Sequence, residues 1–174
     1  MIARQAALIL RRQKSETRRL AREGEELVLD PGIGEILAVR HPSGRVRYQV
    51  DRSEPLILKR SWPALWWRMK DGELEILATK EEQDRAKAAM WSAPAAFVEQ
   101  TGADGWQKGR IQIVRIQLEM LHDITAAGAV REGVATVAEY RALWTSINGR
   151  TPDARWEDNP PVYVLTIDPI GVAT

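Results

Sequence analysis

The N-terminal part of the chain consists of short segments in which apolar and polar residues alternate. Residues 2–12 carry apolar side chains at helical spacing and predict a short helix. Apolar segments at residues 26–30, 35–40 and 45–50 predict three strands, the first of which ends at an Asp-Pro-Gly turn. The last two flank the sequence HPSG, which predicts a hairpin with glycine in its turn. A further strand is expected over residues 55–59.

The β-rich run at residues 110–120 changes the face on which its apolar residues fall. Ile111 and Ile113 share one parity, whereas the later apolar positions have the other. A change of parity inside one strand indicates a β-bulge or a sharp bend. Small barrels use such bends at their corners, so this run favours a barrel.

Two short helices and a last strand are predicted after this run. Asp123 or Thr125 can cap the first helix, and Gly133 can close it. Thr136 can begin the second helix, because a glutamate three residues later completes a capping box, and an Asn-Gly pair ends it. Two prolines then precede a final strand at residues 162–167, where no ladder donor is needed from them.

The middle of the chain, residues 61–106, is interpreted as an insertion between core strands. It contains an Asp71-Gly72 turn signal and a segment after Thr79 that favours a capped helix. We interpret residues 1–174 as a single domain. Many short strands with few helices predict an α+β fold, a small mixed β-barrel flanked by short helices. The sequence lacks G-x-G-x-x-G and G-x-x-x-x-G-K-[ST], which excludes the usual phosphate-binding loops.

Composition narrows the chemistry that the chain can perform. It has no cysteine, which excludes disulfides, thiolate metal sites and a cysteine nucleophile and fits a reducing compartment. His41 and His122 are far apart, so we expect no histidine-rich metal site and no cofactor. With 25 Lys and Arg against 24 Asp and Glu, the net charge does not indicate a polyanionic partner. No signal peptide or membrane-spanning stretch is visible, so we expect a cytoplasmic protein with no membrane partner.

Two local features stand out against this balanced background. The segment at residues 11–22, RRQKSETRRLAR, fits a solvated helix face, a phosphate-binding patch or part of a catalytic site, and its charge alone does not decide. The chain also has seven tryptophans against one phenylalanine. Most tryptophans are packing residues, which is our interpretation of Trp144 and Trp156. Of the adjacent pair Trp66 and Trp67, one points outward in a strand, and Trp67 is the candidate for stacking on a nucleobase.

Several stretches of the chain resemble one family. The C-terminal stretches LHDIT, REG, LWTSING and WEDNPPVYVLTI resemble the C-terminal half of ASCH-domain proteins of the phage and prophage type. The N-terminal hallmark of that family is G-x-K-T-x-T-x-R, and RQKSETRR resembles it. Lys14, Thr17 and Arg19 match its lysine, second threonine and arginine, whereas Ser15 replaces the first threonine. Arg12 occupies the position of the motif's glycine. Glycine there permits a left-handed turn out of the helix, whereas arginine in the same conformation incurs a steric cost.

The resemblance implies a PUA-like β-barrel with a cleft beside the first helix, and RNA or a modified nucleoside as the partner. One branch of the family is an amidohydrolase that removes the acetyl group from N4-acetylcytidine. Carried over residue by residue, its catalytic set falls on Lys14, Thr17 and Glu132. The residues that would bind nucleic acid or substrate are Arg11, Arg12, Arg18, Arg19 and Trp67.

Two functions of different classes remain open from the sequence. One is an amidohydrolase of N4-acetylcytidine-like substrates, and the other is a non-catalytic PUA-like module that binds RNA or modified nucleic acid. In the enzyme, burial and neighbouring arginines would lower the pKa of Lys14, which could then take a proton from Thr17. Glu132 would protonate the leaving amine or activate water. Lys14 and Thr17 share a face in a helix or a turn but point to opposite faces in an extended strand.

Overall fold

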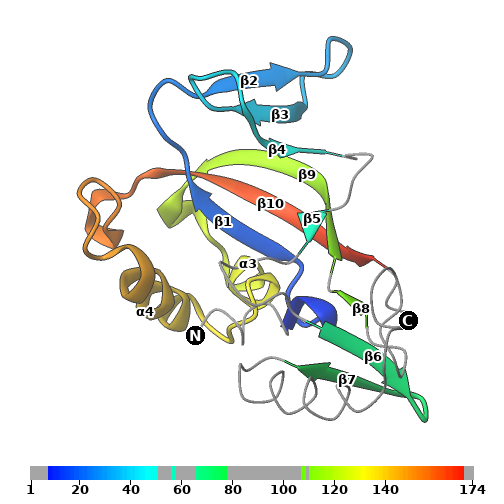
Figure 1. Cartoon of the computed structure of the whole chain (residues 1–174). Helices are drawn as coiled ribbons and strands as arrows, with labels where there is room; N and C mark the ends of the chain where they lie inside the picture. The colour runs from blue at the N-terminus through cyan, green and yellow to red at the C-terminus, as the bar shows by residue number, and fades with distance from the viewer. Residues whose placement is uncertain (1–7, 51–55, 58–65, 78–106, 109, 171–174) are drawn as a thin grey trace. The chain divides into compact units, whose positions relative to one another are not determined.

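The computed structural model describes residues 8–50, 56–57, 66–77, 107–108 and 110–170 (Figure 1). The fold is mixed α+β, with mostly antiparallel strands in three sheets and a few short helices, which confirms the predicted class. Within these residues the strands form no closed barrel. The chain divides into two compact units. One comprises Gln13–Glu54 and Gln112–Asp168, and the other comprises Met1–Arg12, Pro55–Ile111 and Pro169–Thr174.

The first unit contains a sheet in which the last strand of the chain is central. This strand, β10 (Pro161–Ile170), lies between β1 (Glu16–Leu20) and β9 (Arg110–Met120). The pairing of β1 with β10 is antiparallel and places Thr17 opposite Leu165. The sequence did not decide whether the residues around Thr17 form a helix or an extended chain. Residues 16–20 form a strand, and its pairing with β10 fixes its register.

The burial of β9 follows the predicted change of parity only in part. Ile113 and Ile116, which have opposite parity, are both buried. Leu118 and Met120 continue the parity of Ile116 but are 48% and 41% exposed. The apolar pattern thus predicted the strand and its change of face, whereas the burial at its end depends on which neighbours cover it.

A second sheet of this unit is a meander of three short strands. It contains β2 (Glu26–Leu29), β3 (Ile36–Arg40) and β4 (Val46–Gln49) in that order, all antiparallel. The β3–β4 turn is closed by hydrogen bonds from the backbone N–H of His41 to Arg45 O (2.9 Å) and of Gly44 to His41 O (2.8 Å). Gly44 has a φ of +78°, the conformation that favours glycine. The predicted strands and hairpin are confirmed.

Both predicted helices form with the expected caps. Thr125 Oγ1 accepts from the backbone N–H of Gly128 (3.0 Å) at the start of α3 (Ala126–Arg131). Thr136 Oγ1 accepts from the backbone N–H of Glu139 (3.1 Å) at the start of α4 (Val137–Asn148). No helix in the described ranges is long and apolar enough to cross a membrane.

A hydrophobic core cluster of this unit joins α3 and α4 to the start of β10. The buried members of the cluster are Leu121, Ile124, Ala129, Tyr140, Trp144 and Val162. Two 3-10 helices border it, η2 (Leu121–Asp123) and η3 (Trp156–Asp158). Trp144 is 4% exposed and its indole N–H donates to Ala154 O (2.8 Å), whereas Trp156 is half-buried against the cluster. Both tryptophans are packing residues, as predicted.

The other unit contains a small sheet and one further strand pairing. The sheet has the order β7-β6-β8 and consists of β6 (Trp66–Lys70), β7 (Glu73–Leu77) and β8 (Gln107–Lys108). Asp71 and Gly72, with φ of 52° and 81°, make the predicted turn between β6 and β7. β5 (Leu56–Ile57) pairs with the first residues of β9. The helix predicted after Thr79 lies outside the described residues, and residues 8–10 are helical.

Candidate functional site

The candidate site is built on the edge of β1 that faces away from β10. On the β10 side, the backbone N–H of Ala21 donates to Pro161 O (3.0 Å). On the other side, the backbone N–H of Arg18 points outward and donates to Glu132 Oε1 (2.6 Å). Glu132 is the C-cap residue of α3, and Gly133 after it has a φ of +85°. The end of α3 therefore presents a carboxylate to an unpaired strand edge.

Lys14, two residues before the start of β1, also binds Glu132. Its ammonium donates to the backbone oxygen of Glu132 (2.9 Å) and to Glu132 Oε2. The backbone N–H of Ser15 donates to Arg131 O (2.9 Å), which holds the two segments together. Lys14 is 5% exposed and Glu132 is 2% exposed. The structure thus brings together two predicted site residues that are 118 positions apart in the sequence.

Further charged side chains extend the buried Lys14–Glu132 pair into a cluster that reaches the surface at Arg131. The Arg18 guanidinium lies 3.4 Å from Glu132 Oε1, 3.5 Å from Glu16 Oε2 and 3.5 Å from Glu119 Oε2. Arg131 Nε donates to Glu16 Oε1 (2.5 Å). Sequence reasoning missed Glu16, Glu119 and Arg131. The signal for Glu16 was its period-2 spacing from Arg18, which is informative only once β1 is known to be a strand.

The cluster retains unused hydrogen-bonding capacity. Glu16 Oε2 and Arg18 Nε are buried and have no hydrogen-bond partner among the described residues. The Arg18 guanidinium also lies over the Tyr140 ring, with its Cζ 5.9 Å from the ring centroid. Burial, together with the nearby Glu132 carboxylate, raises the pKa of the Tyr140 hydroxyl, which is therefore neutral.

Burial also changes the acid–base behaviour of Lys14. Removal from water lowers the pKa of its ammonium below the ordinary value of 10.5, and the positive charges of Arg19 and Arg18 act in the same direction. The Glu132 carboxylate opposes this shift but does not reverse it. Lys14 consequently reaches its neutral form at a lower pH than an exposed lysine, as a proton acceptor requires.

Thr17 lies on the other face of β1 from Glu16 and Arg18. Successive side chains of a strand point to opposite faces, and Thr17 is half-buried beside its β10 partner. No hydrogen bond joins Thr17 to Lys14 or Glu132 in the described part of the chain. The extended alternative therefore applies to residues 16–20, and of the implied catalytic set the structure joins Lys14 and Glu132 by hydrogen bonds.

The predicted binding residues differ in their exposure to solvent. Arg11, Arg12 and Arg19 are exposed, whereas Arg18 is 6% exposed and engaged with carboxylates inside the cluster. The backbone of Trp67 belongs to β6, but its side chain lies outside the described residues. The exposed cations of the basic segment thus remain candidates for contact with a partner, whereas Arg18 forms ion pairs inside the protein.

Arg12 turns the chain out of the N-terminal helix in the left-handed conformation. Its φ is +55°, and its backbone N–H donates to Ile9 O (2.9 Å). A positive φ of this kind is the conformation that glycine adopts without strain. A side chain in this region costs about 1–2 kcal/mol. Arginine at this position therefore strains the backbone two residues before Lys14.

Replacing Arg12 by glycine should stabilise the protein. The relieved strain of about 1–2 kcal/mol is offset by about 0.5–1 kcal/mol for the extra freedom of glycine in the unfolded chain. We expect the free energy of unfolding to rise by about 0.5–1 kcal/mol, measured by chemical denaturation. Arg11→Gly is the matched control, because Arg11 has no positive φ, and it should lower stability. Equal losses in both variants would contradict the strain at Arg12.

The described residues contain no group of three or more His, Cys, Asp or Glu side chains arranged to hold a metal ion. The comparisons with known proteins add no relative: no family model, no curated protein and no solved structure matches the chain. The function must therefore be argued from the site itself.

Proposed function

We propose that the chain is an ASCH-type domain with a PUA-like fold that acts on RNA or a modified nucleoside, as an amidohydrolase of N4-acetylcytidine-like substrates. The observation that carries this proposal is the contact between Lys14 and Glu132. These residues belong to two of the stretches that resemble the family, RQKSETRR and REG, which lie far apart in the sequence. A buried lysine with a lowered pKa beside a carboxylate is typical of acid–base sites.

The pair supplies the proton transfers that amide hydrolysis needs. Water adds to the acetyl carbonyl carbon, and the neutral Lys14 amine accepts the proton that this water loses. The bond between the carbonyl carbon and N4 then breaks, and the proton returns through the Lys14–Glu132 pair to the leaving amino group. The products are acetate and cytidine. We assign water as the nucleophile because no hydrogen bond joins Thr17 to Lys14 or Glu132 among the described residues.

Incubation of the full chain with N4-acetylcytidine tests the proposal directly. We expect release of acetate and cytidine, loss of turnover by at least a hundredfold in Lys14→Met, and little effect of Thr17→Val. The rate should rise with pH through the lowered pKa of Lys14, below its ordinary 10.5, because the neutral amine is the active form. Circular dichroism verifies that each variant is folded.

Two outcomes would count against this reaction. Absence of turnover in the folded wild-type chain would remove the amidohydrolase. Loss of turnover in a folded Thr17→Val variant, with Lys14 intact, would transfer the nucleophile from water to Thr17. The two results are distinguishable because the first shows that the substrate is not hydrolysed at all, whereas the second changes only the identity of the nucleophile.

A second candidate function is a binding module without chemistry. It is favoured by the way internal donors use the Glu132 carboxylate, which receives hydrogen bonds from Lys14 and from the backbone of Arg18. A carboxylate engaged in this way can serve to fix β1 against α3, while the exposed Arg11, Arg12 and Arg19 contact phosphates. Binding to single-stranded RNA that weakens steeply with salt, in a chain without turnover, would favour this function.

A further inference from the structure

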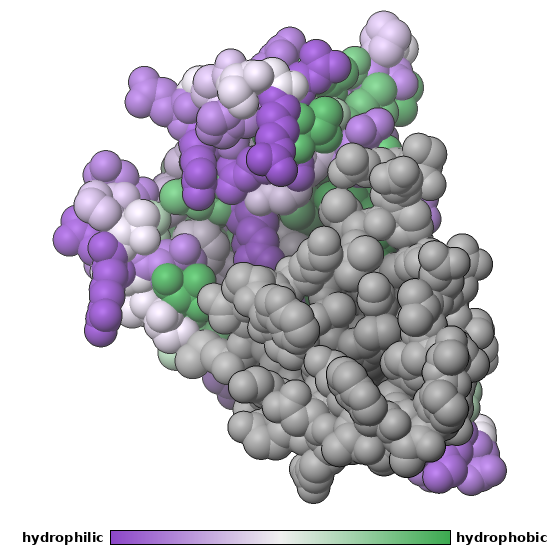
Figure 2. Space-filling model, in the orientation of Figure 1, coloured by the Kyte–Doolittle hydropathy of each residue, from purple (hydrophilic) through white to green (hydrophobic). Residues whose placement is uncertain are grey.

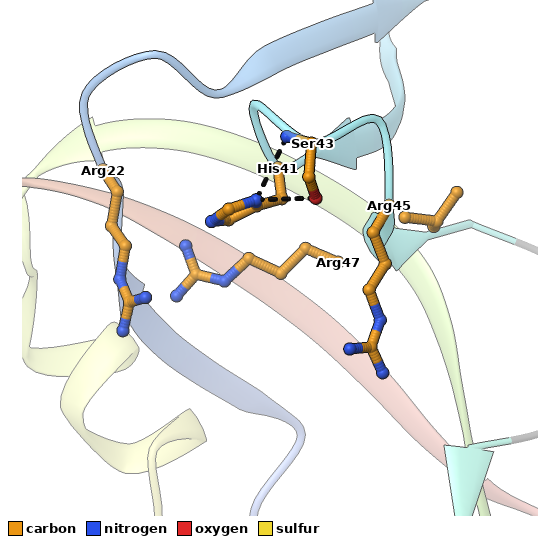
Figure 3. A pocket seen from close by; sticks show the side chains of 6 residues that line it. Arg22, His41, Ser43, Arg45 and Arg47 are labelled. Atoms are coloured by element: carbon orange, nitrogen blue, oxygen red, sulfur yellow. Dashed lines mark hydrogen bonds between the residues drawn. The ribbon is translucent and has the colours of Figure 1, made fainter.

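A pocket lined by arginines lies away from the Lys14–Glu132 pair. Its volume is about 410 Å³. It is formed by the segment after β1, by the β3–β4 turn and by β4 (Figure 3). The lining residues are Arg22, His41, Ser43, Arg45, Val46 and Arg47. Hydrophilic side chains gather over the same part of the surface, above β2, β3 and β4 (Figure 2). Of these residues, Arg22 belongs to the basic segment at residues 11–22, and the sequence singled out none of the others as a site residue.

The pocket carries more positive than negative charge. Of its three guanidinium groups, that of Arg47 is paired with the Glu25 carboxylate. Arg22 and Arg45 are exposed and form no ion pair with any residue in the described ranges. The Arg22 and Arg47 side chains point toward the same space below His41 (Figure 3). An anion placed there would meet the guanidinium of Arg22 beside the Arg47–Glu25 pair, and Arg45 adds a second lining cation that forms no ion pair in the described ranges.

Internal contacts hold part of this surface in a fixed geometry. Arg47 donates to Leu20 O (3.2 Å), and its Cζ lies 4.9 Å from the centroid of the Tyr48 ring. His41 Nδ1 accepts from the backbone N–H of Ser43 (3.2 Å) and lies 2.9 Å from Ser43 Oγ. With Nδ1 accepting, the ring proton of neutral His41 is on Nε2, which makes Nε2 a donor.

The lining selects the chemical class of the ligand. Guanidinium groups present parallel N–H donors that match the oxygens of phosphate, and the His41 ring adds another donor. Val46 is the single apolar lining residue, so an apolar ligand would find little surface to bury. A volume of about 410 Å³ lies within the 300–1,000 Å³ range of small-ligand sites and admits a phosphate with an attached sugar.

We propose that this pocket binds a phosphate group of a nucleotide or of an RNA strand. The phosphate class follows from the lining itself, whereas the nucleotide or RNA as its carrier rests on the proposed function. In that setting the pocket holds the backbone of the substrate strand, and the modified base is handled at a separate site.

Charge reversal at the exposed arginines tests this assignment. Fluorescently labelled single-stranded RNA is titrated with the wild-type chain, with Arg22→Glu and with Arg45→Glu. We expect each variant to bind at least about tenfold more weakly, since it loses a charge-assisted hydrogen bond to the phosphate and gains a repulsive negative charge. Each should also reduce the slope of log K against log salt by about 0.7. Arg150→Glu is the control, because Arg150 is equally exposed and does not line the pocket.

Two small ligands distinguish the contribution of the phosphate to binding from that of the base and sugar. Cytidine monophosphate should compete with the RNA and shift the amide resonances of the β3–β4 turn, whereas cytidine should do neither. Equal binding by Arg45→Glu, Arg22→Glu and Arg150→Glu, or equal competition by cytidine, would overturn the inference. This failure is distinct from failure of the amidohydrolase, which is measured by turnover of N4-acetylcytidine, a substrate that carries no phosphate.

Discussion

Glu132→Ala should lower the free energy of unfolding by about 3–5 kcal/mol, because it leaves a buried ammonium without its carboxylate. The substitution removes the acceptor of the Lys14 ammonium and of the Arg18 backbone N–H, both of which are buried. The Arg18 guanidinium also loses one of its three carboxylates. Chemical denaturation followed by far-ultraviolet circular dichroism measures this change.

An exposed ion pair of the same chain provides the control for this prediction. Glu157 contacts Arg141 at 2.9 Å, and both side chains are more than half exposed. Glu157→Ala should leave the denaturation midpoint nearly unchanged, because water replaces the lost contact. If Glu132→Ala and Glu157→Ala had equally small effects, the buried pair would not stabilise the joint between α3 and β1.

A double-mutant cycle separates the interaction energy of Lys14 with Glu132 from the cost of burying each charge. Lys14→Met and Glu132→Leu each leave one charge uncompensated, whereas the double variant replaces both charges by apolar side chains. We expect the double variant to lose clearly less stability than the sum of the two single losses. Additive losses would indicate that Lys14 and Glu132 act independently.

Trp144→Ala should lower the free energy of unfolding by about 3–5 kcal/mol, which is typical for a large side chain removed from a core. Trp144 is 4% exposed and packs beside Tyr140, with ring centroids 6.3 Å apart. The change also leaves the carbonyl of Ala154, a fully buried residue, without its indole donor. The measurement is the same denaturation experiment.

Two variants separate packing from hydrogen bonding at this position. Trp144→Phe retains most of the packing but not the N–H donor, so it should cost about 1–3 kcal/mol. Ile147→Ala removes an apolar side chain from the same helix, at a position that is 46% exposed, and should cost much less. Similar losses for Trp144→Ala and Ile147→Ala would contradict the assignment of Trp144 to the core.

Local features of the fold were predictable because their causes lie within a few residues. Thr125 and Thr136 cap their helices by accepting bonds from backbone groups three residues ahead. Gly44 and the Asp71-Gly72 pair turn the chain where a positive φ is required. The left-handed backbone at Arg12 belongs to the same class, since the related motif has glycine there.

The candidate site was predictable in some of its members but not in its geometry. Lys14 and Glu132 were named through the resemblance, and the structure places them in contact. Whether Lys14 and Thr17 share a face depended on whether residues 16–20 form a helix or a strand, and pairing with β10 decides this. Arg18, one basic residue among several in the sequence, is buried because Glu16, Glu119 and Glu132 surround it.

The amino-acid sequence by itself determined the α+β class, the caps, the turns and most of the strands of this protein. These features arise from hydrogen bonds and backbone preferences between residues close along the chain. Only the tertiary structure decided which charges are buried together, on which face Thr17 lies, and that Arg22, His41 and Arg45 line one pocket. Such contacts join segments separated by tens of residues, and their free energy depends on the water that the whole fold excludes.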